Sequence, residues 1–176
     1  MLEISGNRIV SLAPLAALDK LTDLCIDSNR VQTLTSLQNL TSLHTLSASA
    51  NRLTTCDGLS TLIALSDLSL DGNRLNCYTA LQSLPQLREL SVVANGLHSL
   101  APLSSLTQLR TLTVNNNLLT SLVGIEPLTR LHTLNAGANH LRDVDALDPL
   151  SRLRRLWVSC NLHLCALSHM ILATVV

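Results

Sequence analysis

The stretch that decides the fold is LRELSVVANGLHSLAPLSSLTQ, residues 87–108. Counted from Asn95, apolar residues follow at +2, +5, +8, +11, +14, +17 and +19, the last two being Leu112 and Val114. The spacing of three suits a 3₁₀-like or extended arm, in which residues three apart eclipse one another. The alternation at residues 112–114 is typical of a short strand with one face inward. Each unit therefore contains a strand and a compact return arm.

The same pattern recurs every 22 residues. An asparagine marks each unit, at Asn7, Asn29, Asn51, Asn73, Asn95, Asn117, Asn139 and Asn161. In the first seven units the apolar positions hold only Leu, Ile, Val and Ala, apart from Cys56 and Tyr78. A single unit cannot bury its apolar side alone, so neighbouring units must stack and close a continuous leucine core.

The recurring asparagine lies where the chain leaves the strand and bends. Its amide offers both donors and an acceptor. A bend inside a stacked coil buries backbone groups that the strand ladder cannot reach, and an asparagine can satisfy them. Aspartate could not donate, and leucine could not form hydrogen bonds through its side chain. We therefore predict that the eight asparagines form a structural ladder without chemical activity.

The motif reads LxxLxLxxN, as in LTDLCIDSN (21–29), LSDLSLDGN (65–73) and LRELSVVAN (87–95). It resembles the leucine-rich repeat family, in the 22-residue class that includes a regulatory subunit of protein phosphatase 1 and bacterial internalins. The resemblance covers residues 1–161. It implies an α/β leucine-rich repeat solenoid, an arc with a concave parallel sheet of about eight strands and short 3₁₀ or irregular convex arms. Similar proteins are binding modules and not enzymes.

With the motif numbered as positions 1–9, positions 3, 5, 7 and 8 should face the concave side. Strands about 4.8 Å apart align equal positions in columns. Through the fifth strand the columns at positions 3, 5 and 7 contain six acids and no base. The candidate partner-binding residues are Glu3, Asp23, Asp27, Asp67, Asp71, Glu89, Asn115, Arg155 and Trp157.

Such a negative face favours a basic protein partner, and Trp157 is of the type most common in binding hot spots. The alternative is a solvated acidic face with Trp157 covered by the C-terminal tail. Phosphatase-binding relatives use acidic and aromatic side chains on this face, and Asp67, Asp71, Glu89 and Trp157 match in type and column. A single aromatic residue is a departure from that pattern, so a phosphatase catalytic subunit is one candidate partner.

A second column follows the asparagines at position 10. It contains Arg8, Arg30, Arg52 and Arg74. These arginines could hold an anionic partner, could pair with flanking acids or could keep the edge soluble. We favour the structural interpretations for this column.

Composition excludes several classes of function. Twelve basic and twelve acidic residues give zero net charge, which argues against a generic nucleic-acid or anionic-membrane binder. No apolar run is long enough to span a membrane. We find no phosphate-binding loop and no HExxH or GxSxG motif, so we expect no enzyme and no cofactor.

Five scattered cysteines and no signal peptide favour a reduced cytoplasmic or nuclear protein. A secreted internalin-like adhesin is the alternative, because SLAPLAAL (11–18) and SLAPLSSL (99–106) resemble the arms of internalins.

The C-terminal stretch gathers Cys160, His163, Cys165 and His169. Zinc ligands usually come in two separated pairs, and four ligands in so short a segment would crowd. We attribute the cluster to loss of the repeat after Asn161 and expect no metal.

Residues 1–161 are thus the repeats and residues 162–176 a non-repeat tail. The chain starts inside a strand without a cap and ends in an apolar tail, so we expect a fragment, or ends that associate with each other.

Overall fold

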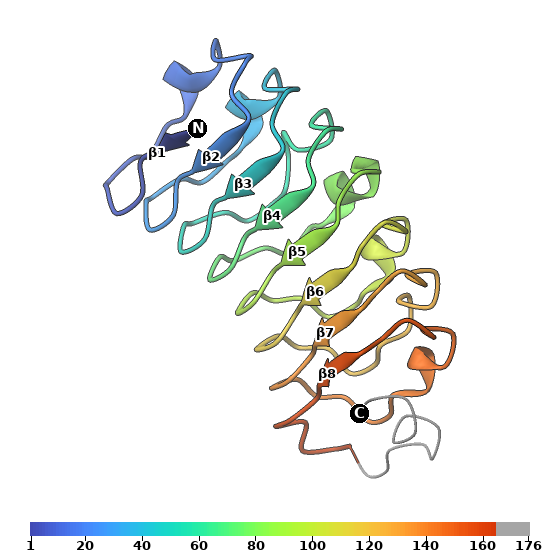
Figure 1. The fold of residues 1–176 in the computed structure, drawn as a ribbon. Helices are drawn as coiled ribbons and strands as arrows, with labels where there is room; N and C mark the ends of the chain where they lie inside the picture. The colour runs from blue at the N-terminus through green and yellow to red at the C-terminus, as the bar shows by residue number, and fades with distance from the viewer. Residues whose placement is uncertain (165–176) are drawn as a thin grey trace.

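The computed structural model describes residues 1–164. Each repeat contributes one short strand to a single parallel sheet, and the strands follow one another in chain order (Figure 1). The strands are β1 Leu2–Glu3, β2 Asp23–Cys25, β3 Thr45–Ser47, β4 Asp67–Ser69, β5 Glu89–Ser91, β6 Thr111–Thr113, β7 Thr133–Asn135 and β8 Arg155–Trp157. The predicted eight-stranded leucine-rich repeat solenoid is confirmed.

The register of the sheet equals the sequence period. Leu24 of β2 lies beside Leu46 of β3, and Leu46 lies beside Leu68 of β4, each pair 22 residues apart. The same offset holds at every strand pair from β1 to β8. Equal motif positions therefore form straight columns across the sheet.

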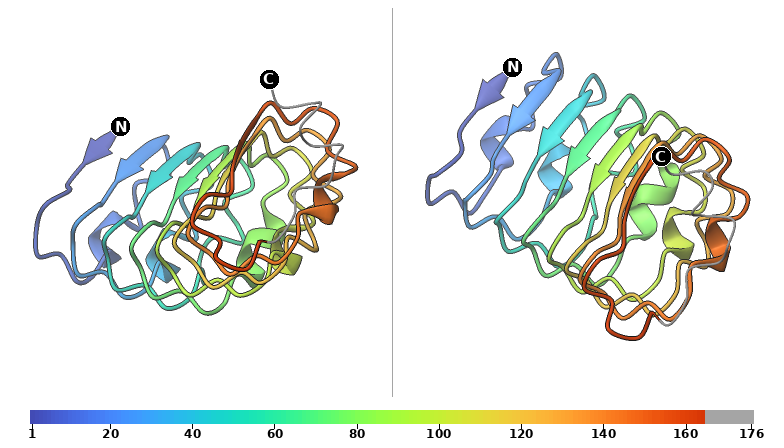
Figure 2. Two further views of the ribbon diagram at one scale, coloured as in Figure 1. Left: turned by 90° about the horizontal axis from the view of Figure 1, so that it is seen from below. Right: turned by 60° about the horizontal axis from the view of Figure 1, so that its bottom comes forward.

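The return arms lie on the opposite side of the coil from the sheet (Figure 2). Five arms contain a 3₁₀ helix: η1 Ala13–Leu15, η2 Thr35–Leu37, η3 Thr79–Ser83, η4 Ala101–Leu103 and η5 Asp145–Leu147. The arms of the third and sixth repeats turn without one. Both have glycine at position 16, Gly58 with φ +95° and Gly124 with φ +103°. The return arms are therefore of two kinds, which the spacing of three did not distinguish.

The core is the continuous stack of leucines that the period predicts. Every predicted apolar position from Val31 to Leu153 is buried. Each fully buried leucine stabilises the fold by roughly 1.5–3 kcal/mol relative to an exposed one. At the ends burial falls, so that Ile9 and Leu156 are half-buried and Leu18 is exposed.

The bend after each strand depends on a left-handed residue at position 8. All eight such residues have positive φ, between +50° and +68°: Gly6, Ser28, Ala50, Gly72, Ala94, Asn116, Ala138 and Cys160. This conformation costs residues other than glycine and asparagine roughly 1–2 kcal/mol. Position 8 therefore belongs to the turn, which our assignment of it to the concave columns did not anticipate.

Within residues 1–164 no helix combines the length and the hydropathy that crossing a bilayer requires.

Candidate binding face

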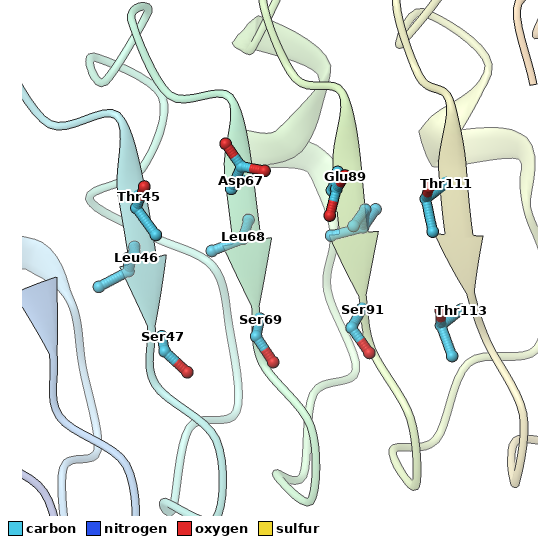
Figure 3. Close-up of a pocket in the computed structure, with 11 residues that line it drawn as sticks. Thr45, Leu46, Ser47, Asp67, Leu68, Ser69, Glu89, Ser91, Thr111 and Thr113 are labelled. Atoms are coloured by element: carbon cyan, nitrogen blue, oxygen red, sulfur yellow. The ribbon is translucent and has the colours of Figure 1, made fainter. Parts of the chain in front are cut away.

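The concave face of the sheet contains a hollow of about 200 Å³ over β3–β6. Figure 3 shows its two rows of side chains. The position 3 row is Thr45, Asp67, Glu89 and Thr111, and the position 5 row is Ser47, Ser69, Ser91 and Thr113. Small hydroxyl side chains thus surround two carboxylates near the middle of the sheet.

The two carboxylates of the hollow differ in their surroundings. The Ser66 hydroxyl donates a hydrogen bond to Oδ2 of Asp67. Glu89 is exposed, and no group within residues 1–164 donates to its carboxylate. Glu89 is therefore free to accept hydrogen bonds from a ligand, and Asp67 keeps acceptor capacity on its second oxygen.

Asp27 and Asp71, predicted to contact a partner, each bind the next strand. Oδ1 of Asp71 accepts hydrogen bonds from the Ser91 hydroxyl and from the backbone N–H of Val93, both at 2.7 Å. Asp27 accepts equivalent bonds from Ser47 at 2.7 Å and from the N–H of Ser49 at 2.6 Å. These carboxylates therefore join neighbouring repeats, and only part of their acceptor capacity faces solvent.

Glu3 and Asp23 lie toward the N-terminal end of the same face. The hydroxyl of Thr22 donates to Asp23 at 2.6 Å, and this bond lowers the pKa of Asp23 below its ordinary value. Hydrogen bonds from Ser5 lower the pKa of Glu3 in the same way. Both carboxylates are consequently ionised at neutral pH, and they extend the negative potential of the face.

The remaining predicted residues lie beyond the hollow. Trp157 of β8 is 47 % exposed and pairs in register with Asn135 of β7. The hollow ends at β6, so Arg155 and Trp157 form a separate region two strands away. Asn115 lies at position 7 after β6, where its carbonyl accepts the N–H of Ala94 at 3.2 Å. The predicted face is one surface with two distinct regions.

The asparagine ladder works through the backbone. In Asn73, Nδ2 donates to the carbonyls of Ala48, Leu70 and Asp71, and Oδ1 accepts the N–H of Leu53 at 2.9 Å. The same four contacts recur at Asn29, Asn51, Asn117, Asn139 and Asn161.

The two other ladder asparagines make fewer contacts. Asn95 makes three of the four, and Asn7 bonds only to carbonyls of its own repeat. Each buried amide therefore joins its repeat to the preceding one, and no side-chain amide bonds to another within residues 1–164.

The position 10 arginines are all exposed, and within residues 1–164 none lies within 4.0 Å of a carboxylate. Pairing with flanking acids, one of our interpretations, is thus not what the structure shows. Arg52 and Arg74 line a groove together with Gln32, Thr33 and Thr54.

The cysteines of the described part of the chain form no disulfide. Cys25, Cys56, Cys77 and Cys160 are free thiols, and burial raises the pKa of Cys56 to about 12. Residues 1–164 contain no group of three Cys, His, Asp or Glu side chains arranged to hold a metal. Cys165 and His169 of the C-terminal cluster lie outside the described residues.

Sequence reasoning missed a column of hydroxyls at position 13. The side-chain oxygens of Ser11, Thr33, Thr55, Ser99 and Ser121 each accept the backbone N–H two residues later, at 3.1–3.4 Å. These bonds start the return arms. Recurrence of Ser or Thr four residues after the ladder asparagine is the signal that could have revealed them.

A sheet of one strand per repeat, an asparagine ladder and a leucine core define a solenoid of stacked coils. The chain has the leucine-rich repeat fold. The family model of leucine-rich repeats in two copies matches residues 85–128. A comparison with curated protein sequences finds no match.

Solved structures share the fold. Internalin C2 of Listeria monocytogenes is 26 % identical with a TM-score of 0.78, over 92 % of this chain and 77 % of its own. An internalin, InlF, of the same organism is 22 % identical with a TM-score of 0.62, over 90 % of this chain and 60 % of its own. TLR13, solved in complex with ssRNA13, is 22 % identical with a TM-score of 0.75, over 93 % of this chain and 24 % of its own. The chain thus spans only part of each relative.

Proposed function

We propose that this chain is a protein-interaction module without catalysis, and that its concave face binds a cationic segment of a partner. The observation that carries the proposal is the hollow over β3–β6, with Asp67 and Glu89 among small hydroxyls. Glu3 and Asp23 add negative charge toward the N-terminal end. Recognition then depends on shape and charge, and the negative potential accelerates the encounter with a basic partner.

We propose two narrower functions as alternatives, the first from the sequence resemblance and the second from the solved structures. A regulatory subunit of a phosphatase would use the acidic residues and Trp157 together. An internalin-like secreted protein is favoured by the 26 % identity with internalin C2. Pulldown with a phosphatase catalytic subunit distinguishes them, because only the first predicts capture that is lost in Trp157→Ala.

The test of the concave site uses a fluorescein-labelled peptide of alternating lysine and alanine, followed by fluorescence anisotropy at low salt. We expect Asp67→Asn combined with Glu89→Gln to weaken binding by about tenfold, because two carboxylates that would pair with lysine are removed. The matched control is Asp143→Asn with Asp148→Asn, which removes the same charge from exposed residues next to η5. Equal weakening in both double variants would contradict a site in the hollow.

A further inference from the structure

A basic surface lies at the edge where the chain enters the strands of the last four repeats. In Figure 1 this is the edge away from the arrowheads of β5–β8. We name it the entry patch. Its members occupy positions 2 and 22 and are Arg88, Arg110, Arg130, His132, Arg152 and Arg154. The proposed function gives these residues no role.

Backbone hydrogen bonds hold the position 2 residues in a row. The N–H of Arg110 donates to the carbonyl of Arg88, that of His132 to Arg110, and that of Arg154 to His132, all at 2.8 Å. Successive side chains in this row therefore start about 4.8 Å apart. In the flanking position 22 column, Nη1 of Arg130 donates to Oε1 of Gln108 in the preceding repeat.

The arginines of the patch form no ion pair within the described chain. Its five arginines are exposed, and the one ion pair closer than 4.0 Å within residues 1–164 joins Lys20 to Asp19. Guanidinium groups at this spacing repel one another, and an anion bound between them would relieve the repulsion. A hollow of about 520 Å³ opens among His132, Ser151, Arg152, Leu153 and Arg154. The part of the patch nearest β8 is therefore both charged and concave.

We propose that the entry patch binds a short acidic segment of a polypeptide. Guanidinium groups bind carboxylates through two parallel hydrogen bonds, which gives geometric as well as electrostatic selection. The row of four position 2 residues spans roughly 14 Å, the length of about four extended residues. An extended run of aspartate or glutamate matches this length.

The surroundings of the patch favour a peptide over a long polyanion. Glu89 follows Arg88 directly, and Asp67, one strand further, adds a second carboxylate. A nucleic-acid strand running along the solenoid would pass both carboxylates, whereas a short peptide ends at Arg88 and does not reach Asp67. The acidic segment therefore binds at the entry edge, whereas the cationic segment of the proposed function binds on the concave face. The two segments have opposite charge, and the present proposal does not depend on the proposed function.

The experiment uses a fluorescein-labelled hexaglutamate peptide with Gly-Ser flanks, measured by fluorescence anisotropy in low salt. We expect Arg110→Gln with Arg154→Gln to reduce affinity by about tenfold, since two guanidinium partners are lost. Arg8→Gln with Arg52→Gln removes the same charge from the strand-exit edge and should change affinity less than twofold. Because all four side chains are exposed, circular dichroism should show every variant folded.

Three results would overturn the proposal. The first is the absence of saturable binding to the unaltered protein. The second is equal loss of affinity in the two double variants, which would mean a diffuse field and no local site. The third is tighter binding of a labelled twelve-nucleotide oligothymidylate that is lost in the Arg110/Arg154 variant, which would make nucleic acid the ligand. The lysine–alanine peptide should bind the Arg110/Arg154 variant at least as tightly as the unaltered protein, because only positive charge is removed, and this separates the test from that of the concave site.

Discussion

The ladder asparagine satisfies more backbone groups than any other side chain of the repeat. In Asn73 one amide serves three carbonyls and one N–H, and the residue is only 7 % exposed. An unsatisfied buried backbone group costs about 1–3 kcal/mol, whereas each satisfied bond contributes less than that. The value of the asparagine therefore lies mainly in the penalties it prevents.

We expect Asn73→Ala to lower the free energy of unfolding by about 2–4 kcal/mol. The buried N–H of Leu53 loses its partner, and the carbonyls of Ala48, Leu70 and Asp71 each lose one of two donors. Urea unfolding followed by circular dichroism measures the change. Asn7→Ala is the matched control, since the Asn7 amide is exposed and donates only to carbonyls of its own repeat, and it should cost less than about 1 kcal/mol. Equal losses at the two positions would show that coupling between repeats is not the source of the effect.

For single residues, the sequence predicted the structural role of the asparagines. It did not predict that Asp27 and Asp71 bond to the neighbouring strand. Eight recurrences at a fixed spacing identify the ladder without coordinates. Asp27 and Asp71 have the composition of a binding surface, but each bonds to a hydroxyl 20 residues away. These bonds form because the next strand has a serine at position 5, Ser47 beside Asp27 and Ser91 beside Asp71. The composition of the position 7 column alone does not reveal such a bond. A comparison of the position 7 column with the position 5 column of the next repeat could have predicted it.

Among the elements, the return arms vary most. Where position 16 is Pro14, Ser36, Ala80, Pro102 or Ala146 the arm forms a 3₁₀ helix, and where it is Gly58 or Gly124 it does not. A Cβ built on Gly58 would lie 2.4 Å from the carbonyl oxygen of Leu34 in the preceding repeat. The glycine arm therefore approaches its neighbour more closely than a side chain allows.

Gly58→Ala should destabilise the fold by about 2 kcal/mol or more, because strain at positive φ adds to a contact with rigid backbone. Thermal unfolding by differential scanning calorimetry measures the loss. Gly96→Ala is the control, since an added Cβ there would lie 3.6 Å from the nearest atom, the carbonyl oxygen of Leu75. A similar loss at both glycines would contradict the assigned role of position 16.

The strands and the core were predictable from the spacing of apolar residues in the sequence. These residues alternate in the strand and recur at every third position in the return arm. The two kinds of arm were not, because the apolar spacing is identical in both. Glycine at position 16 was the available signal. A glycine at this position indicates an arm without a 3₁₀ helix only when the contact with the preceding arm is known.

Considered as a whole, the molecule is a stack in which each repeat contacts only its neighbours. Stability of such a stack is approximately a sum of repeat and interface contributions. Its charge is also distributed by position, with acids on the concave face and arginines at the entry edge. Zero net charge does not show this separation, because it is an average over the molecule. It argues against a generic nucleic-acid or anionic-membrane binder and leaves local basic patches open.

Deletion of residues 96–117 removes one complete repeat and joins Asn95 to Leu118 in phase. We expect a folded protein whose denaturant slope in urea is smaller by roughly one eighth, because that slope follows the surface exposed on unfolding. Deletion of residues 96–106 removes half a repeat and places polar residues in the core columns, so it should abolish the cooperative transition. A folded half-repeat variant would contradict the dependence on phase.

The scarcity of aromatic residues gives this solenoid two optical reporters at fixed places. Its single tryptophan is half-exposed on the last strand, and its single tyrosine, Tyr78, is 4 % exposed in the fourth repeat. Indole emission thus reports on one end of the stack, and tyrosine absorbance reports on the interior. Fraying from the end would separate the two signals during denaturation, without any attached dye.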